Sequence, residues 1–283
     1  MPRTEVEGLS IAYDVIGEGR PWILTPGGRF SKDYGGVREL AVALAEHGNR
    51  VVIWDRPNCG ESEVCFTGES ESEMQADVLA GLLRELDMAP AVIIGGSGGA
   101  RVSLLAANRH RDVARAVAVW WISGGVFGLL SLASYYCAPA VPAVWNGGME
   151  TVATIPSWAE VFERHPPNRD RLLAQDPKEF IAAMERWMEA YCSCSGELVP
   201  GLPDADARSL DIPALVFRSG ASDPNHPRET SEQVAALLPN SQLAEPPWPD
   251  TEWIDRARGV WQEFERWPLL APQLAEWANT TLD

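Results

Sequence analysis

The stretch Ile93-Ile94-Gly95-Gly96-Ser97-Gly98-Gly99-Ala100-Arg101 decides how the rest of the chain is interpreted. An apolar run leads into it and a helix-like stretch follows. Gly95, Ser97 and Gly99 fit the pattern G-x-S-x-G, which holds a serine on a sharp turn between a strand and a helix. Glycines flank the serine because a Cβ atom would clash in such a turn. Ser97 is the candidate nucleophile; the simpler alternative is a serine that only caps the helix.

Short apolar strands alternate with helical stretches on both sides of this turn. The alternation predicts a doubly wound, mostly parallel sheet. We expect strands at 4–6, 9–15, 22–25, 50–54, 91–94, 114–121, 214–217 and 242–245. We expect helices at 40–46, 71–87, 100–108 and 227–238, and a helical tail at 252–282 with a break at Trp267-Pro268.

The alternation of strands and helices stops after residue 123 and returns near residue 204. The stretch between these points holds helical segments and prolines but no clear strand, and Phe180, Met184 and Trp187 share one helical face. We therefore expect a core formed by residues 1–123 and 204–283, and a helical cap insertion at 124–203.

The serine turn follows the fifth expected strand, and with this placement the chain resembles proteins of the α/β-hydrolase fold over essentially its full length. The resemblance implies an α/β-hydrolase core with an inserted helical cap and a serine nucleophile that works without a metal or an organic cofactor. It assigns the acid of the catalytic triad to Asp223, in the loop after strand 214–217. Asp223-Pro224 is also a common turn pair, so a purely structural role is the alternative.

An oxyanion hole needs two backbone N–H groups aimed at the developing negative charge. Gly98 follows the nucleophile and supplies one of them at a helix N-terminus. The second is expected from Pro26-Gly27-Gly28-Arg29, at Gly28 or Arg29, although the family often carries His-Gly there. An ordinary strand-ending turn is the alternative for this loop.

The catalytic histidine is the point at which the chain departs from the family. The family places it just after the last strand, and residues 245–253 contain no histidine. His226 lies three residues after Asp223 and is the best candidate for the base; the alternative is a histidine that shapes the turn or contacts substrate. The other three histidines, which lie at helix ends or in a polar part of the cap, are His47, His110 and His165.

Two carboxylates occupy the region where the family has its histidine. Asp250 or Glu252 could act as an alternative base or orient His226, and burial beside tryptophan would raise the pKa of such a carboxyl. The simpler alternative is that these residues begin a helix. Arg29 and Arg101 flank the serine in sequence, and each either binds a substrate carboxylate or forms a structural salt bridge.

Twelve tryptophans make the chain rich in large aromatic side chains. Such side chains line pockets well. We expect Trp121, Trp187 and Trp248 to line the substrate pocket, which implies an apolar substrate with an aromatic or cyclic part.

The composition of the chain limits the kinds of partner that it can bind. The formal charge of −17 argues against nucleic acid and anionic membranes. No run of 18 apolar residues is present, so we expect no membrane span. An N-terminus without an apolar signal core and an odd number of cysteines, five, favour free thiols and a cytoplasmic location. We expect a small-molecule substrate. Whether the protein forms a homodimer is left open by the sequence.

The sequence therefore predicts a serine hydrolase that cleaves a small apolar ester, a lactone or a C–C bond next to a carbonyl. The alternative is a lyase, a cyclase or a ligand-binding protein that has this fold but lacks a complete triad. Removing the base of a serine triad lowers turnover by about 10⁶-fold. The distance between His226 and Ser97 therefore distinguishes the hydrolase from the non-hydrolytic alternative.

Overall fold

The computed structural model describes residues 2–192 and 194–282 and is built around one eight-stranded sheet. The strand order is β1-β2-β4-β3-β5-β6-β7-β8, and all pairs from β4 across to β8 are parallel, while β1–β2 and β2–β4 are antiparallel. The strands are β1 (Arg3–Val6), β2 (Leu9–Ile16), β3 (Arg20–Thr25), β4 (Asn49–Trp54), β5 (Ala91–Gly96), β6 (Ala114–Trp120), β7 (Ala214–Phe217) and β8 (Ser241–Ala244). The predicted mostly parallel sheet is confirmed.

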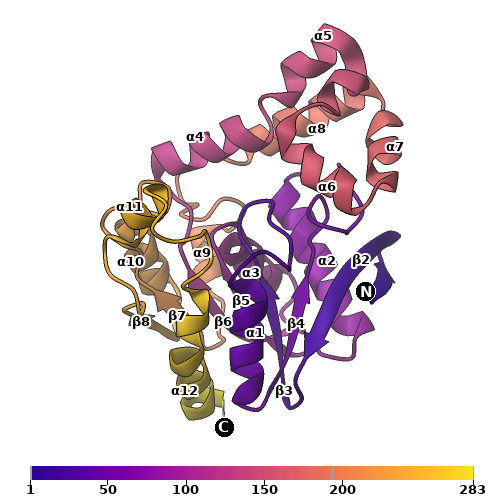
Figure 1. Cartoon of the computed structure of the whole chain (residues 1–283). Coiled ribbons are helices and arrows are strands. Elements are labelled where there is room, and N and C mark those ends of the chain that lie inside the picture. Colours follow the sequence, from indigo (N-terminus) through magenta and orange to yellow (C-terminus); the bar gives the residue numbers. More distant parts are fainter. Residues whose placement is uncertain (1, 193, 283) are drawn as a thin grey trace.

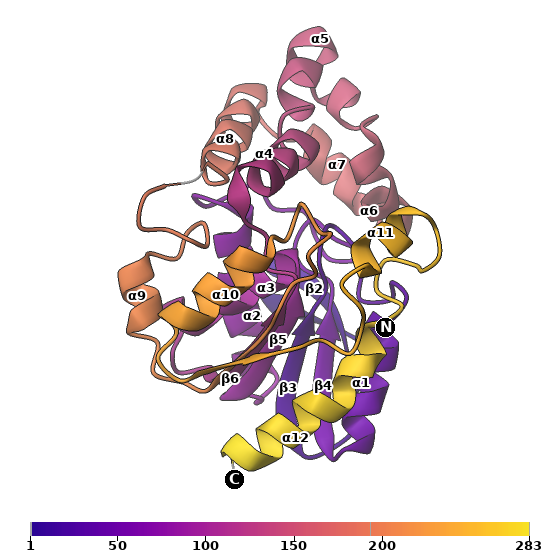
Figure 2. The same ribbon diagram turned by 90° about the vertical axis from the view of Figure 1, so that its left-hand side faces the viewer.

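Helices cover both faces of the sheet, which is why its central strands are apolar runs rather than alternating patterns. In β5, Ile93 packs toward one cluster of core residues and Ile94 toward the other. One face carries α2 (Glu71–Glu85), α3 (Gly98–Arg109) and α10 (Arg228–Leu237), and the opposite face carries α1 (Val37–Glu46), η2 (Trp267–Leu270) and α12 (Ala271–Leu282). Figure 2 shows α1 and α12 side by side on their face.

An inserted helical region lies between β6 and β7, above the ends of the strands (Figure 1). It contains α4 (Gly125–Tyr136), α5 (Ala140–Val152), η1 (Pro156–Trp158), α6 (Ala159–Arg164), α7 (Pro167–Leu173) and α8 (Pro177–Glu189). Two isolated bridges, Cys194 with Glu197 and Val199 with Leu202, follow, and a short helix, α9 (Asp204–Arg208), leads to β7. The expected helical insertion is present.

One segment of this region, Gly125–Arg164, is long and apolar enough by composition to cross a membrane, with a window of mean hydropathy 1.4. The structure divides it into separate helices, and non-helical backbone at Gly147 and Gly148 interrupts α5. The longest of these helices, α5, has 13 residues, fewer than the about 20 that a membrane-spanning helix needs.

The tail differs from the expected helix at 252–282, which was to break only at Trp267-Pro268. Helix α11 (Glu252–Ala257) ends just before Gly259, whose φ of +74° stops helical continuation. Residues 258–266 then form a loop that carries Phe264 into an aromatic cluster with Phe30 and Tyr34. The helix prediction was therefore wrong at 258–266, because the burial of Phe264 overrides local helix propensity.

Candidate active site

Ser97 lies on the predicted sharp turn between β5 and α3. Its backbone has φ 56° and ψ −123°, a conformation that costs a non-glycine residue about 1–3 kcal/mol. The Ser97 N–H donates to the carbonyl of Trp120, 3.1 Å away, which ties the turn to β6. A Cβ atom on Gly95 would lie 2.5 Å from the Gly99 carbonyl oxygen, and one on Gly99 would lie 2.0 Å from that of Thr25. The turn therefore requires both glycines.

His226 contacts the serine directly. Its Nε2 atom lies 2.9 Å from the Ser97 hydroxyl oxygen, and its Nδ1 atom lies 2.7 Å from Oδ2 of Asp223. The other carboxylate oxygen of Asp223 accepts the backbone N–H groups of Asn225 and His226. Nδ1–H therefore donates to the carboxylate and Nε2 is free to accept from the hydroxyl, which is the geometry of a serine–histidine–aspartate triad.

The imidazole of His226 is buried and is supported from one side by tryptophan. Trp121 stacks on it with ring centroids 6.1 Å apart and an angle of 23°, and Trp248 packs on Trp121 at 5.6 Å. Arg256 lies over the Trp121 ring, 4.6 Å from its centroid. Trp121 and Trp248 thus pack behind the histidine and hold it in place.

Two glycines, Gly98 and Gly28, line the space beside the serine. Gly98 is the first residue of α3, where the N–H groups lack helical partners and the helix dipole favours negative charge. A Cβ atom on Gly98 would lie 3.4 Å from the Gly28 nitrogen. The Arg56 guanidinium donates to the carbonyl oxygens of Gly27 and Gly28 and holds this loop. The Gly28 nitrogen is thus close to Gly98, which fits one of the two predicted loop donors. The side chain of the other, Arg29, pairs with Glu71.

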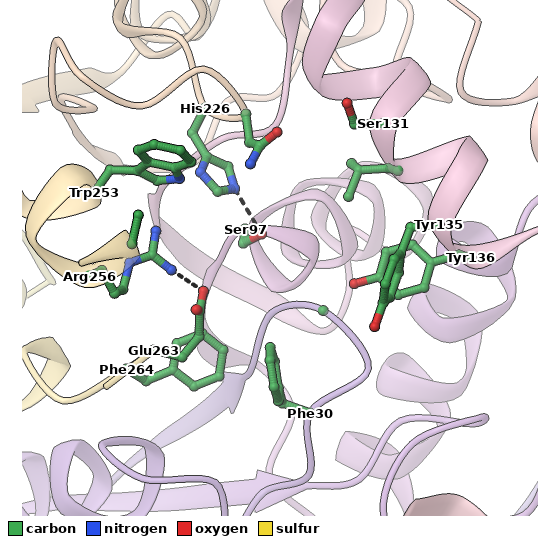
Figure 3. A pocket seen from close by; sticks show the side chains of 14 residues that line it. Phe30, Ser97, Ser131, Tyr135, Tyr136, His226, Trp253, Arg256, Glu263 and Phe264 are labelled. Carbon is green, nitrogen blue, oxygen red and sulfur yellow. Dashed lines mark hydrogen bonds and ion pairs between the residues drawn. The ribbon is translucent and has the colours of Figure 1, made fainter. Parts of the chain in front are cut away.

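Two spaces meet at the serine. The outer cavity of about 520 Å³ opens between α4, α11 and the loops that follow β3 and α11 (Figure 3). Its aromatic lining comes from Phe30, Tyr135, Tyr136, Trp253 and Phe264. The inner cavity, of about 30 Å³, shares Gly28, Ser97, Leu132 and Tyr136 with the outer one. The outer cavity has room for a small organic substrate.

The expected pocket role of Trp187 is not what the structure shows. Its side chain is fully buried inside the helical region, where it stacks on Phe66 with centroids 6.2 Å apart. It lines neither cavity, and neither do Trp121 and Trp248. The aromatic residues of the outer cavity were missed because they come from the loop after β3, from α4 and from the tail, which meet only in the folded chain. No sequence signal marked them.

The two carboxylates at the usual histidine position lie apart from the serine. Asp250 is largely exposed and pairs with Arg228. Glu252 begins α11, is buried and lies 3.2 Å from Arg256. Burial raises the pKa of the Glu252 carboxyl to about 7, with the nearby Asp223 carboxylate adding to the shift and Arg256 opposing it. No hydrogen bond within the described residues joins either carboxylate to Ser97 or His226.

The remaining polar groups do not form a second reactive site. His110 pairs with Asp77 at 2.7 Å at the opposite end of α3, and His47 is exposed at the end of α1. Across residues 2–192 and 194–282, no group of three or more His, Cys, Asp and Glu side chains could hold a metal ion. The five cysteines are free thiols, and burial raises the pKa of Cys59 and Cys137 to about 12.

Comparison with known proteins adds to this geometry. The sequence profile described as "Alpha/beta hydrolase family" matches residues 22–258. A "Putative non-heme haloperoxidase" of a Mycobacterium phage is 34% identical over 112 residues, which are 39% of this chain and 39% of the phage protein. A 2-hydroxy-6-oxononadienedioate/2-hydroxy-6-oxononatrienedioate hydrolase of Pseudomonas putida is 24% identical over 83% of each chain.

Among solved structures, an enol-lactonase from Burkholderia xenovorans superposes with a TM-score of 0.62 at 21% sequence identity. The superposition covers 98% of this chain and 100% of the lactonase. At this sequence identity, the likeness to the lactonase shows a shared fold and no more.

Proposed function

Because the chain belongs to the alpha/beta hydrolase family, we propose that it is a serine hydrolase that cleaves a small apolar ester, a lactone or a C–C bond next to a carbonyl. The observation that carries the proposal is the continuous hydrogen-bonded line from Ser97 through His226 to Asp223. The family relationship alone would not carry it, since folds host many chemistries.

In the proposed reaction His226 accepts the hydroxyl proton at Nε2 while the Ser97 oxygen attacks the substrate carbonyl carbon. The negative charge on the carbonyl oxygen is held by the N–H groups of Gly98 and Gly28. His226 then gives its proton to the leaving group, which departs and leaves an acyl-serine. Water, deprotonated by His226, attacks the acyl carbon and releases the acid. Asp223 stabilises the imidazolium in both stages.

The outer cavity supports a substrate with an apolar part. Phe30, Tyr135, Trp253 and Phe264 line it from three different segments of the chain. Flat aromatic walls favour planar or cyclic groups, because ring faces and edges pack against them. The names of the relatives, an enol-lactonase and a hydrolase of an oxo-dienedioate, support the classes lactone and C–C bond.

The alternative of a non-hydrolytic lyase, cyclase or binding protein rested on the histidine missing after the last strand. His226 reaches the serine from the loop after β7 instead. The hydrogen bond supports hydrolysis, since a binding protein has no need of a strained serine in contact with an imidazole.

A substrate panel tests the proposal. Phenyl and p-nitrophenyl esters of short acids, five- and six-membered lactones and a vinylogous 1,5-diketone represent the three bond types. We expect hydrolysis of at least one class by the unaltered protein and loss of it in Ser97→Ala. Ser209→Ala is the matched control, because Ser209 is exposed at the end of α9 and lines neither cavity. Equal hydrolysis by Ser97→Ala, or none on any class, would refute the proposal.

A further inference from the structure

Three arginine side chains surround the inner cavity beside the serine. The side chain of Arg29 is 7% exposed, and Arg56 and Arg101 are 3% and 4% exposed. One carboxylate, Glu71, also lines the cavity and lies 3.3 Å from Arg29. Three buried positive charges therefore face one buried negative charge, in a protein whose formal charge is −17.

Much of the hydrogen-bonding capacity of these arginines is committed to the protein. Arg101 donates to the carbonyls of Pro200 and Ala190, and Arg56 to those of Gly27 and Gly28. These bonds fix the guanidinium planes. The arginines are thus held rigidly and cannot swing out to solvent.

Other N–H groups of the same arginines have no partner within the described residues. They are buried Nε and Nη1 of Arg29, Nε of Arg56 and Nη1 of Arg101, and the buried hydroxyl of Ser123 on the same cavity also has none. Burial lowers the pKa of Arg101, whereas the Glu71 carboxylate holds the pKa of Arg29 above its usual value against burial. A buried unpaired charged donor is costly unless an acceptor joins it. The lining of the inner cavity, with three arginines and one carboxylate, therefore carries an excess of positive charge that favours an anion.

The position of His226 decides which part of the substrate enters this space. The imidazole must protonate the leaving group, so the leaving group lies beside His226. His226 lines the outer cavity and is not among the residues that line the inner one. The leaving group therefore occupies the outer, aromatic cavity, and the acyl group extends into the inner cavity.

The inner cavity also limits the size of the acyl group. Its volume of about 30 Å³ has room for roughly two or three non-hydrogen atoms, given that one water needs about 10–15 Å³. A carboxylate has three, so it fills the inner cavity, and the methylene that joins it to the reacting carbonyl lies at the junction with the outer cavity beside Ser97. Planar guanidinium groups match carboxylates in shape and charge.

We propose that the inner cavity binds a carboxylate at the end of a short acyl group, so that the preferred substrates are half esters of small dicarboxylic acids such as malonic acid. This inference rests on the proposed hydrolase function for its kinetic consequence. The anion site itself depends only on the three arginines.

A matched pair of substrates tests the preference in the unaltered protein. Phenyl hydrogen malonate and the phenyl ester of malonamic acid have the same size and leaving group, and they differ in a carboxylate against a neutral amide. We expect kcat/KM to favour the carboxylate by about 100-fold. Equal values, or a preference for the amide, would overturn the inference.

Arginine variants locate the source of the preference. Arg29→Gln and Arg101→Gln should each reduce the carboxylate-to-amide ratio by about tenfold or more. Arg109→Gln is the control, because Arg109 lies on the same helix as Arg101 but pairs with Asp77 at the surface. A ratio that stays unchanged in both cavity variants would contradict the assignment. Thermal unfolding identifies any variant that fails to fold. The comparison of the two substrates in the unaltered protein does not depend on the variants.

Calorimetry on Ser97→Ala separates this inference from the proposed function, since it needs no turnover. Malonate should bind to this protein, neutral malonamide and inorganic phosphate should bind at least about tenfold more weakly, and Arg101→Gln should weaken the binding of malonate. Such binding without any hydrolysis by the unaltered protein would refute the hydrolase and leave the carboxylate site standing. Hydrolysis with no preference for malonate over malonamide would refute only the carboxylate site.

Discussion

The Nε2 atom of His226 lies 2.9 Å from the hydroxyl oxygen of Ser97, although 129 positions separate the two residues in the sequence. The histidine comes from the loop that also carries Asp223, three residues earlier, and not from the end of the last strand. One short loop thus supplies both the imidazole and the carboxylate that orients it. This compact arrangement explains how the chain can lack a histidine at residues 245–253 and still place one on its serine.

Asp223→Asn should lower kcat by about 10³–10⁴-fold with little change in stability. The amide cannot accept the Nδ1–H bond in the same way, so the imidazole loses the tautomer that leaves Nε2 free. Steady-state kinetics on the best ester of the panel measures the effect. Asp77→Asn, at the second His–Asp pair of the molecule, serves as the control and should keep activity within about twofold. An active Asp223→Asn protein would show that the carboxylate has only a structural role.

Gly99→Ala should destabilise the fold by about 3 kcal/mol or more, because its Cβ atom would lie 2.0 Å from the Thr25 carbonyl oxygen. Gly35→Ala is the control, since Gly35 is exposed and has no atom within 4 Å of its built Cβ. Urea unfolding monitored by tryptophan fluorescence gives both values. Equal stability of the two variants would mean that the turn is not as tight as described.

Trp187→Ala should affect stability, whereas Trp253→Ala should affect substrate binding. Trp187 is fully buried on Phe66, so its loss should cost about 3–5 kcal/mol of stability. Trp253 is half-buried and lines the outer cavity, so its loss should raise KM for aromatic esters while the melting temperature changes little. Calorimetric melting and steady-state kinetics on both variants test the pair. A raised KM in Trp187→Ala without loss of stability would restore its predicted pocket role.

Glu252→Gln should change the pH dependence of stability. Burial raises the pKa of Glu252 from 4.5 to about 7, so the folded protein keeps a proton that the unfolded chain loses between these values. Stability from this group is complete below the lower value and is lost as the pH rises through about 7. The melting temperature of Glu252→Gln relative to the unaltered protein should therefore increase from about pH 5 to about pH 8. Glu185→Gln, at an exposed position on α8, should show no such trend; a flat difference for Glu252→Gln would refute the raised pKa.

Much of the fold follows from local patterns. All eight expected strands are present within a few residues of their expected ends, because buried apolar runs bounded by turns leave few alternatives. The tail was harder: Gly259 ends α11, and the loop after it is held by contacts of Phe264 with Phe30, some 230 positions earlier. Contacts at such separation leave no periodic signal in a single sequence.

Some residues of the site could likewise be predicted from local patterns, and others could not. Ser97, Gly98 and Gly28 could be located from glycine patterns, because tight turns impose those residues locally. The sequence favoured His226 among the four histidines because it follows Asp223, but it left open whether His226 is the base or only shapes the turn, since that depends on where the loop after β7 lies. The tryptophan interpretation failed for Trp187 because a large aromatic residue on an amphipathic helix packs equally well in a core or along a pocket.

The measurement closest to the central claim is the rate at which a fluorophosphonate probe modifies Ser97, followed by mass spectrometry of the adduct. The reaction needs an activated serine but no natural substrate. We expect the unaltered protein to be labelled on Ser97, His226→Ala to be labelled at least about 10³-fold more slowly, and His110→Ala to match the unaltered protein. Labelling of His226→Ala at the unaltered rate, or no labelling of Ser97 in the unaltered protein, would contradict the account.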